Sequence, residues 1–361
     1  MAQLGFHATG SYGAGPGNRQ FGDKWRWWID NNTRLLIKNL AARPDRIRYL
    51  AENRPPLGLN TSTTSGDLMI LVTGATGTVG RPLVSALRHR GIPVRALVRN
   101  PRNLPAEWDA GVEPVTADLG DPASLTPALT GVDAVYLLTP VHPDAEQQQR
   151  NVIDAAVRTG RPRVVLHAAV GLGRPDVTPV RFFAAHAAGL DQLNATGLDW
   201  TALAPNGFWQ NYLGMAESLR SGTLALPAGD TAVSYVDARD VAETAAAVLT
   251  GDGNAKTVLE VTGPEALTHA RIAARIGAAL GHDVAYRDLT PDQARAGMLA
   301  AGMPAWQVDG LVELYGMYAA GEAATVADTV PRLLGRPARS LDDFLRDHAA
   351  ALRAAPADDR G

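Results

Sequence analysis

The stretch Met69–Gly80, MILVTGATGTVG, decides the fold of this chain. Its apolar start predicts a short buried strand of a parallel sheet. Glycines follow at Gly74, Gly77 and Gly80, and they lead into a helical pattern over Arg81–His89. In such a turn the first glycine permits the tight bend, the second lets the backbone approach a pyrophosphate, and the third allows close packing of helix on strand. The sequence therefore predicts a dinucleotide-binding crossover, with the phosphates at the helix N-terminus.

The residues between these glycines, Thr76, Thr78 and Val79, are expected to contact the same dinucleotide. A glycine motif alone is weak evidence, and an ordinary glycine turn is the alternative. The strand before the motif, the helix after it and a matching second strand make the dinucleotide-binding interpretation specific.

Length and composition narrow the class of protein. The chain has 361 residues, of which 46% are hydrophobic and 20% charged, enough to bury the core of one large α/β domain or two smaller ones. A net charge of −3 gives no global field that would attract nucleic acid. The absence of cysteine excludes disulfides and cysteine metal sites, and no metal is expected. No apolar run reaches the roughly 18 residues of a membrane span, and no secretory signal opens the chain, so we expect a cytoplasmic protein.

Residues 1–68 differ from the remainder and are predicted to be an N-terminal extension with an amphipathic helix and a linker. Trp25, Trp28 and Leu36 fall near helical spacing before Pro44 breaks the pattern. The extension carries nine Lys/Arg and five Asp/Glu. A basic, Trp-rich stretch can lie on a membrane surface or a partner. Because its basic residues are spread on several sides, we favour an arm that packs its tryptophans on the main domain or on a second subunit.

From residue 69 onward, strands alternate with helices. Strands are expected at residues 69–72, 93–98, 112–117, 134–138, 163–168, 200–204 and 258–261. Helices are expected at 81–89, 121–129, 147–159, 182–196, 267–280, 291–302, 305–320 and 340–353. This alternation predicts an α/β protein with a Rossmann-type, doubly wound parallel sheet. We assign residues 69–205 to an NADP-binding Rossmann domain and 206–352 to a small C-terminal substrate lobe, interleaved with the last strands of the sheet.

The residues after the strands indicate the cofactor, because ligands bind beyond the carboxyl ends of parallel strands. A conventional NAD site has an acidic residue after the second strand, where this chain has Arg99, with Arg102 nearby. A guanidinium can hold a 2′-phosphate, so we expect NADP(H); a solvated arginine is the alternative. Asp118 and Leu119, after the third strand, are expected beside the adenine. Leu138, Thr139 and Pro140, after the fourth strand, are expected beside the nicotinamide half.

Five segments carry a family resemblance. They are GATGTVG (74–80), VRALVRNP (94–101) and residues 186–211, 234–249 and 258–281. Through them the chain resembles the NmrA-like, atypical short-chain dehydrogenase/reductases, which include bacterial NAD(P)H-dependent quinone reductases. The resemblance spans about residues 69–352 and implies a Rossmann fold and NAD(P)H binding. The family also holds nucleotide-binding regulators and biosynthetic enzymes, so membership alone leaves the activity open.

The usual dehydrogenase triad of Ser, Tyr and Lys is missing. The fifth strand ends in His167-Ala168-Ala169 without a hydroxyl, and the positions of the Tyr-x-x-x-Lys pair hold Phe182 and His186. None of the three lysines has a Tyr four residues before it. His186 is thus the candidate catalytic residue and a candidate cofactor contact, since an imidazole can donate a proton near neutral pH. A structural or substrate-contacting histidine is the alternative.

The segment after the sixth strand is the candidate substrate region. In the resembling family it contacts nicotinamide and substrate, which implies roles for Asn206, Phe208, Trp209, Asn211 and Tyr212. Aromatic rings suit a flat apolar ligand, and amides can bind its oxygens. The alternative for each ring is core packing.

Further candidates lie outside this segment. His142, in the loop after the fourth strand, is a candidate substrate contact, and Trp306, Tyr315 and Tyr318 are candidates for the opposite wall.

We therefore expect an NADP(H)-dependent oxidoreductase that passes hydride to a conjugated, quinone-like or enone-like small molecule. A non-catalytic NADP(H)-sensing regulator and a non-redox cyclase or isomerase are the alternatives. No nucleic-acid partner is expected, and a homo-oligomer is left open.

Overall fold

The computed structural model describes residues 68–354 except 102–103, 107 and 109–110. The predicted N-terminal extension, with its amphipathic helix, lies outside the described residues apart from Leu68, and so does Arg102.

The strands of the main sheet are β1 (Ile70–Val72), β2 (Val94–Val98), β3 (Val112–Thr116), β4 (Ala134–Leu137), β5 (Arg163–His167), β6 (Trp200–Pro205) and β9 (Thr257–Val261). The helices packed around it are α3 (Gly80–His89), α4 (Pro122–Leu129), α5 (Ala145–Arg158), α6 (Arg181–Thr196), α8 (Ala238–Thr250) and α12 (Thr329–Leu334).

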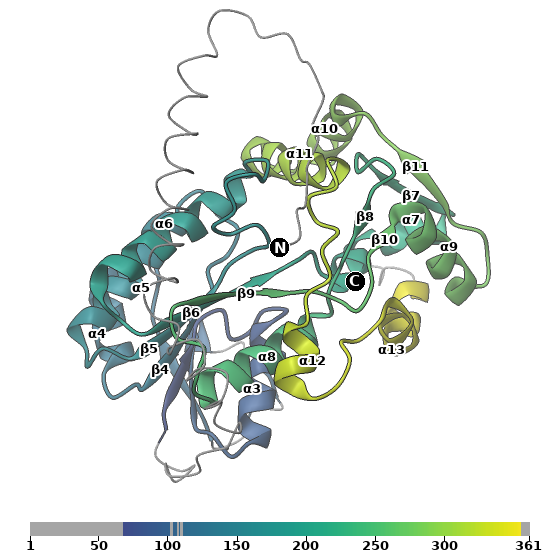
Figure 1. The fold of residues 1–361 in the computed structure, drawn as a ribbon. Helices are drawn as coiled ribbons and strands as arrows, with labels where there is room; N and C mark the ends of the chain where they lie inside the picture. Colours follow the sequence, from purple (N-terminus) through teal and green to yellow (C-terminus); the bar gives the residue numbers. More distant parts are fainter. Residues whose placement is uncertain (1–67, 102–103, 107, 109–110, 355–361) are drawn as a thin grey trace, which may run out of the picture. The chain divides into compact units, whose positions relative to one another are not determined.

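The main sheet is parallel, with the strand order β3-β2-β1-β4-β5-β6-β9. The order reverses between β1 and β4, which is the position where open parallel sheets bind ligands. Helices α4, α5 and α6 cover one face of the sheet, and α3 and α8 cover the other (Figure 1). This confirms the predicted doubly wound Rossmann fold.

Burial explains why these segments form strands. Every residue of β1, β4 and β6 is buried, because helices pack on both faces of the sheet. Strand β3 lies at the edge and is largely exposed, with only Val112 buried. The continuous apolar runs that predict the strands are thus the sign of a sheet covered on both sides.

The remaining elements form a second lobe. They are η2 (Trp209–Met215), α7 (Ala216–Arg220), β7 (Thr223–Leu226), β8 (Ala232–Val233), β10 (Leu267–Thr268), α9 (His269–Leu280), β11 (Ala285–Asp288), α10 (Pro291–Ala300), α11 (Ala305–Ala319) and α13 (Leu341–Arg353). Its core gathers around Trp209, Tyr212 and Phe344, all almost fully buried. Two small sheets, β7 with β11 and β8 with β10, complete it.

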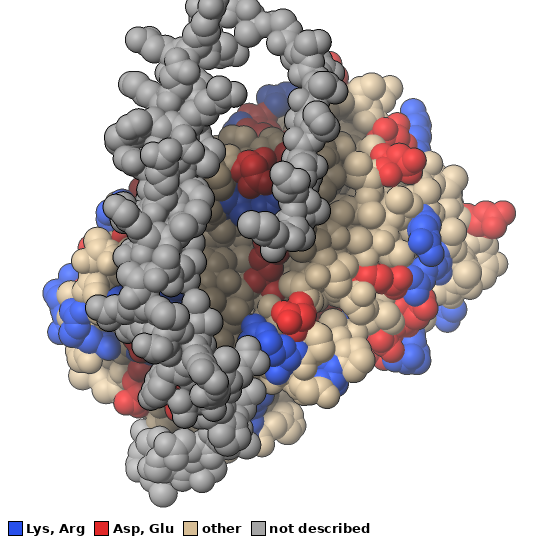
Figure 2. Space-filling model, viewed as in Figure 1, with Lys and Arg blue, Asp and Glu red and all other residues tan. Residues whose placement is uncertain are grey.

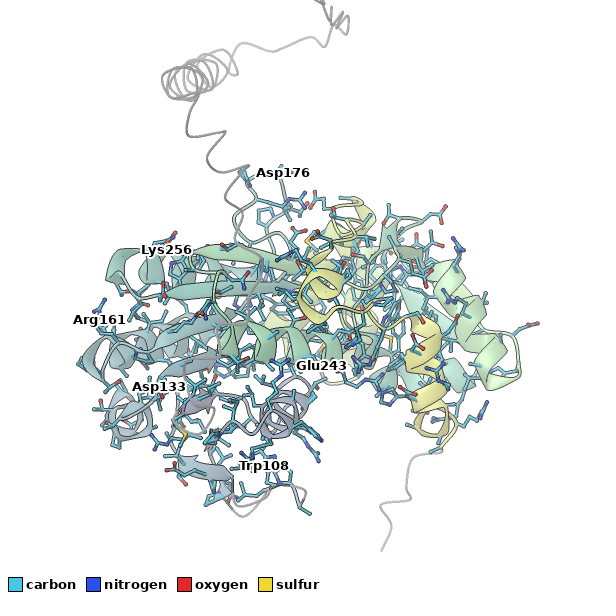
Figure 3. All side chains as sticks on the ribbon, turned by 60° about the horizontal axis from the view of Figure 1, so that its bottom comes forward. Trp108, Asp133, Arg161, Asp176, Glu243 and Lys256 are labelled. Atoms are coloured by element: carbon cyan, nitrogen blue, oxygen red, sulfur yellow. The ribbon has the colours of Figure 1, made fainter. Side chains whose placement is uncertain are left out.

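The lobe lies beyond the carboxyl ends of the strands. Asp133, Arg161 and Lys256 precede β4, β5 and β9, and they lie together at the opposite end of the sheet (Figure 3). Helix α8 and strand β9 return from the lobe to the main sheet, so the two parts are interleaved, while the predicted boundary at residue 205 stays a prediction. Basic and acidic side chains are interspersed on the face shown in Figure 2.

Several short elements differ from the sequence expectation. Strands β7, β8 and β11 are not predicted, and the helix expected at 267–280 begins only at His269, because Leu267 and Thr268 form β10. These strands have two to four residues, and β11 is mostly exposed, so they lack the apolar period that identifies a strand.

An ion-pair network around the buried Asp240 joins α8 to the chain after α12. Asp240, with no exposed surface, binds the guanidinium groups of Arg336 (2.7 Å) and Arg339. Glu243 binds the same arginines at 2.6 and 2.7 Å. Burial opposes the charge on Glu243, yet its hydrogen bonds to both arginines outweigh burial and hold the pKa of its carboxyl below its usual range. Glu243 is labelled on α8 in Figure 3.

We expect the substitution Asp240→Ala to lower the free energy of unfolding by about 3 kcal/mol, because two arginines lose a buried partner. Chemical denaturation measures this loss. The control is Asp328→Ala, which removes an exposed ion pair with Arg332 (3.8 Å) and should leave stability unchanged. Equal losses in both variants would contradict a structural role for the buried network.

Candidate active site

The glycine turn opens directly onto the switch point of the sheet. Gly74 has a φ of +62°, and its carbonyl oxygen accepts the N–H of Gly77 at 2.9 Å. A Cβ at Gly80, where α3 begins, would lie 2.0 Å from that same oxygen. Thr76, Gly77 and Thr78 are exposed, whereas Val79 is buried against the sheet. The backbone at the start of α3 is thus exposed at the position where the sequence predicts that the phosphates bind.

Thr73 joins this turn to the loop after β4. Its buried hydroxyl accepts the N–H of Leu138 at 2.7 Å and lies 2.7 Å from the Leu138 carbonyl oxygen. A Cβ at Gly74 would lie 2.6 Å from the Leu138 side chain. The structure therefore places Leu138, and with it Thr139 and Pro140, beside the glycine turn.

The predicted adenine-end residues lie at the same edge. Arg99 is exposed immediately after β2, the neighbour of β1, and its side chain makes no ion pair within the described residues. Asp118 follows β3, is exposed, and accepts the N–H of Gly120 at 2.7 Å. The carbonyl of Leu119 accepts a hydrogen bond from the Asn151 amide at 2.9 Å.

A cavity of about 150 Å³ lies at the predicted nicotinamide end. It is formed by the loop after β4, the start of α6 and one ring of α11. Its lining includes Thr139, Pro140, His142, Phe182, His186 and Trp306. The rings of Phe182 and Trp306 lie 5.3 Å apart, so aromatic surface forms one wall. This cavity, called the histidine-lined cavity below, brings His186 of α6 together with three predicted residues of the loop after β4: Thr139, Pro140 and His142.

His186 is held by a residue that the sequence analysis missed. The amide nitrogen of Gln149 lies 3.1 Å from Nδ1 of His186 and donates to the Thr139 hydroxyl at 3.0 Å. Burial lowers the pKa of His186 to about 4, so the ring is neutral near pH 7. Gln149 lies four residues after Ala145 and three before Val152, on the buried stripe of α5. A polar residue in register with buried apolar residues of the helix is the sequence signal that could have identified Gln149.

His167 lies near His186 at the end of β5. Its Nδ1 is 2.6 Å from the Tyr136 hydroxyl, and its ring centre is 6.2 Å from that of Phe208. Burial, with a further effect of His186, lowers the pKa of His167 to about 3. Two neutral imidazoles and the ring of Phe208 thus stand at the carboxyl edge of β5.

Other predicted substrate residues lie elsewhere. Trp209 and Tyr212 are buried in the core of the second lobe. Asn206 is buried, and its amide donates to Ser234 at 2.9 Å. Asn211 is exposed on the wall of a second cavity of about 850 Å³. The structure therefore does not bring these four residues to the histidine-lined cavity.

The three candidates for the opposite wall separate in the same way. Trp306 lines the histidine-lined cavity, Tyr315 lines the second cavity, and Tyr318 is buried.

Among the described residues, no group of three or more His, Cys, Asp or Glu side chains is arranged to hold a metal ion. In the same part of the chain, no helix has the length and apolar character needed to cross a membrane.

The fold and the glycine turn define a Rossmann-type, dinucleotide-binding protein, and comparisons with known proteins agree. A family described as NAD(P)H-binding matches residues 74–252. An NAD(P)H azoreductase of Xenophilus azovorans is 38% identical over 80% of this chain and 100% of its own length. A (4-alkanoyl-5-oxo-2,5-dihydrofuran-3-yl)methyl phosphate reductase of Streptomyces griseus subsp. griseus is 37% identical over 78% of this chain and 99% of its length.

A solved structure is similarly related. The NADPH-dependent quinone oxidoreductase of Escherichia coli, complexed with NADPH, superposes with a TM-score of 0.71 at 29% identity, covering 77% of this chain and 99% of that one. The chain belongs to this NAD(P)H-binding family of NmrA-like, atypical short-chain dehydrogenase/reductases. It is an NAD(P)H-dependent oxidoreductase.

We expect Gly77→Ala to weaken NADPH binding about tenfold without lowering the melting temperature. A Cβ at Gly77 meets only the Gly74 oxygen, at 3.2 Å, and otherwise fills the open side where a pyrophosphate would lie. Gly80→Ala should instead destabilise the fold, because its Cβ would collide with backbone. Nucleotide titration and thermal unfolding separate the two effects. Unchanged NADPH affinity in Gly77→Ala would contradict this placement of the pyrophosphate.

Proposed function

We propose that the protein reduces a conjugated, quinone-like or enone-like small molecule with hydride from NADPH. The observation that carries this proposal is the histidine-lined cavity beside the loop after β4, at the edge that carries the glycine turn. Its walls combine the rings of Phe182 and Trp306 with the neutral imidazole of His186. Such a cavity suits a flat, conjugated acceptor with one or two oxygens.

Arg99 supports a preference for NADPH over NADH. Its exposed guanidinium follows β2, where a carboxylate would bind the ribose hydroxyls of NADH and repel a 2′-phosphate. A guanidinium can bind a phosphate through two parallel hydrogen bonds.

The chemistry fits a site without the Tyr and Lys of the usual triad. NADPH supplies the hydride when bound. The chain's own residues hold the acceptor close to the cofactor edge and exclude water behind the aromatic wall. Addition of hydride to a quinone or enone leaves a delocalised oxyanion, which takes its proton from water, because His186 is neutral near pH 7. Because its negative charge is delocalised, this oxyanion depends less on a positioned acid than the alkoxide formed from a simple ketone.

The related proteins support the same class of acceptor. One is named as an azoreductase and another as a quinone oxidoreductase, and each name describes a conjugated acceptor.

We expect steady NADPH oxidation with small para-quinones and enones. The loss of reduced-nicotinamide absorbance measures it. A saturated ketone of similar size is the control, and its kcat/KM should be at least about a hundredfold lower, a difference of about 2.7 kcal/mol in transition-state stabilisation. Tight NADPH binding without turnover of any conjugated acceptor would overturn the proposal. Equal affinity for NADP⁺ and NADPH in that case would favour a nucleotide-sensing regulator.

We expect Arg99→Ala to raise the KM for NADPH about tenfold, equivalent to about 1.4 kcal/mol, because a charge-assisted contact to the 2′-phosphate is lost. The KM for NADH should stay unchanged, since NADH lacks that phosphate. The matched control is Arg158→Ala, an exposed arginine in the last turn of α5, at the opposite end of the sheet. An equal effect of Arg99→Ala on both cofactors would be inconsistent with this role.

A further inference from the structure

Gln149 lies where three elements meet below the histidine-lined cavity. It belongs to α5 and is 1% exposed. Its amide nitrogen donates to the hydroxyl of Thr139, in the loop after β4, and lies 3.1 Å from Nδ1 of His186, on α6. Both of these partners line the cavity, while Gln149 itself stands behind them. One buried amide therefore sets the positions of two cavity residues.

A glycine in α6 makes room for this amide. Gly189 lies inside the helix, where glycine is less favourable than alanine. A Cβ at Gly189 would lie 2.3 Å from Oε1 of Gln149. This oxygen is buried and has no hydrogen-bond partner among the described residues. The structure places the amide nitrogen, and not this oxygen, on the side of Thr139 and His186.

The contact defines the tautomer of His186. An amide N–H can only donate, so Nδ1 of the ring accepts and the ring proton resides on Nε2. Nε2 has no partner within the described part of the chain and is not sealed inside the protein, since the ring lines the cavity. The Nε2–H group is therefore available to a ligand in the cavity.

We propose that Gln149 is a positioning residue that fixes His186 as the Nε2–H tautomer, so that a neutral imidazole donates a hydrogen bond to the acceptor oxygen on which negative charge develops. This inference rests on the proposed function for the identity of the acceptor. The donated hydrogen bond strengthens as hydride arrives, and this is the property that lowers the barrier.

The charged groups around His186 are compatible with a neutral ring. His167, from β5, is itself neutral near pH 7 because burial lowers its pKa to about 3. The other titratable groups of the cavity are each paired elsewhere. Glu146 binds Arg150, Arg181 binds Glu313, and His142 lies near Asp144. No carboxylate within the described residues is hydrogen-bonded to His186.

The pH dependence distinguishes a neutral donor from an acid. With a pKa of about 4, His186 stays neutral throughout the range from pH 6 to 8. A neutral donor then gives a kcat that does not change across this range. A protonated histidine acting as general acid would instead lose activity as the pH rises through about 6.5, the ordinary histidine pKa.

The decisive experiment is nitrogen NMR of the full chain labelled at histidine, with His186 assigned by its loss in His186→Gln. We expect the Nε2–H tautomer in the unsubstituted protein and a mixture of tautomers in Gln149→Leu. In the same variant kcat should fall about tenfold, with an unchanged KM for NADPH and an unchanged fold. Gln149→Glu should accept the proton of Nδ1, raise the pKa of His186 and make kcat depend on pH. An Nδ1–H tautomer in the unsubstituted protein would overturn the proposal.

Two matched controls separate positioning from packing. Gln192 also joins α6 to α5, through Asp154 at 2.7 Å, so Gln192→Leu should leave tautomer and kcat unchanged. If Gln149→Leu does not fold, Gly189→Ala is the second test, because the new Cβ would displace the same amide. Its control is Gly316→Ala, which adds a Cβ in open space at another helical glycine. The NMR experiment measures the tautomer without turnover, so it tests the positioning role of Gln149 by itself. If the protein reduces no conjugated acceptor, the donor role of His186 is overturned together with the proposed function.

Discussion

The hydrogen bonds of the Thr73 hydroxyl to the Leu138 backbone are the constraint on which the site depends. They join the carboxyl ends of β1 and β4 at the point where the strand order reverses. The glycine turn follows one of these strands, and the loop with Thr139 follows the other. A single buried hydroxyl therefore sets the spacing between the glycine turn and the histidine-lined cavity. The parallel pairing of β1 with β4 ends at Val72 and Tyr136, and without the Thr73 hydrogen bonds the loops that follow these strands could diverge.

The chain retains the nucleotide-binding half of its family and has a different arrangement where the dehydrogenase triad would lie. In that triad, Tyr is the acid, and a Lys lowers its pKa and holds the ribose. Here Phe182 and His186 hold those positions, and the ring of Phe182 packs on Trp306 to form a wall. Burial removes the positive charge from both nearby imidazoles. The site therefore has neutral imidazoles and apolar surface where the triad has ionisable groups, and this difference is consistent with the delocalised acceptor proposed above.

The sequence predicts the sheet because its central strands are buried on both faces, and buried strands appear as unbroken apolar runs. The glycine turn and Arg99 follow from local spacing in the same way. Gln149 and Gly189 could not be paired from the sequence, because they lie 40 positions apart in the chain, on two different helices. Trp209 and Tyr212 show the opposite difficulty. Rings directly after a strand end look like ligand contacts, yet the second lobe folds over them and takes them into its core.

The return of β9 to the main sheet after α8 has a consequence for biosynthesis. Strand β6 pairs with β5 on one side and with β9 on the other, so its second row of backbone N–H and C=O groups stays unpaired until residue 261 has left the ribosome. All six side chains of β6 are buried in the finished molecule. A nascent chain that ends after β6 and before β9 would expose β6 as an unpaired, apolar edge strand. Such an edge can pair with other chains and cause aggregation. Premature termination in this interval would thus be more harmful to proteostasis than an earlier stop.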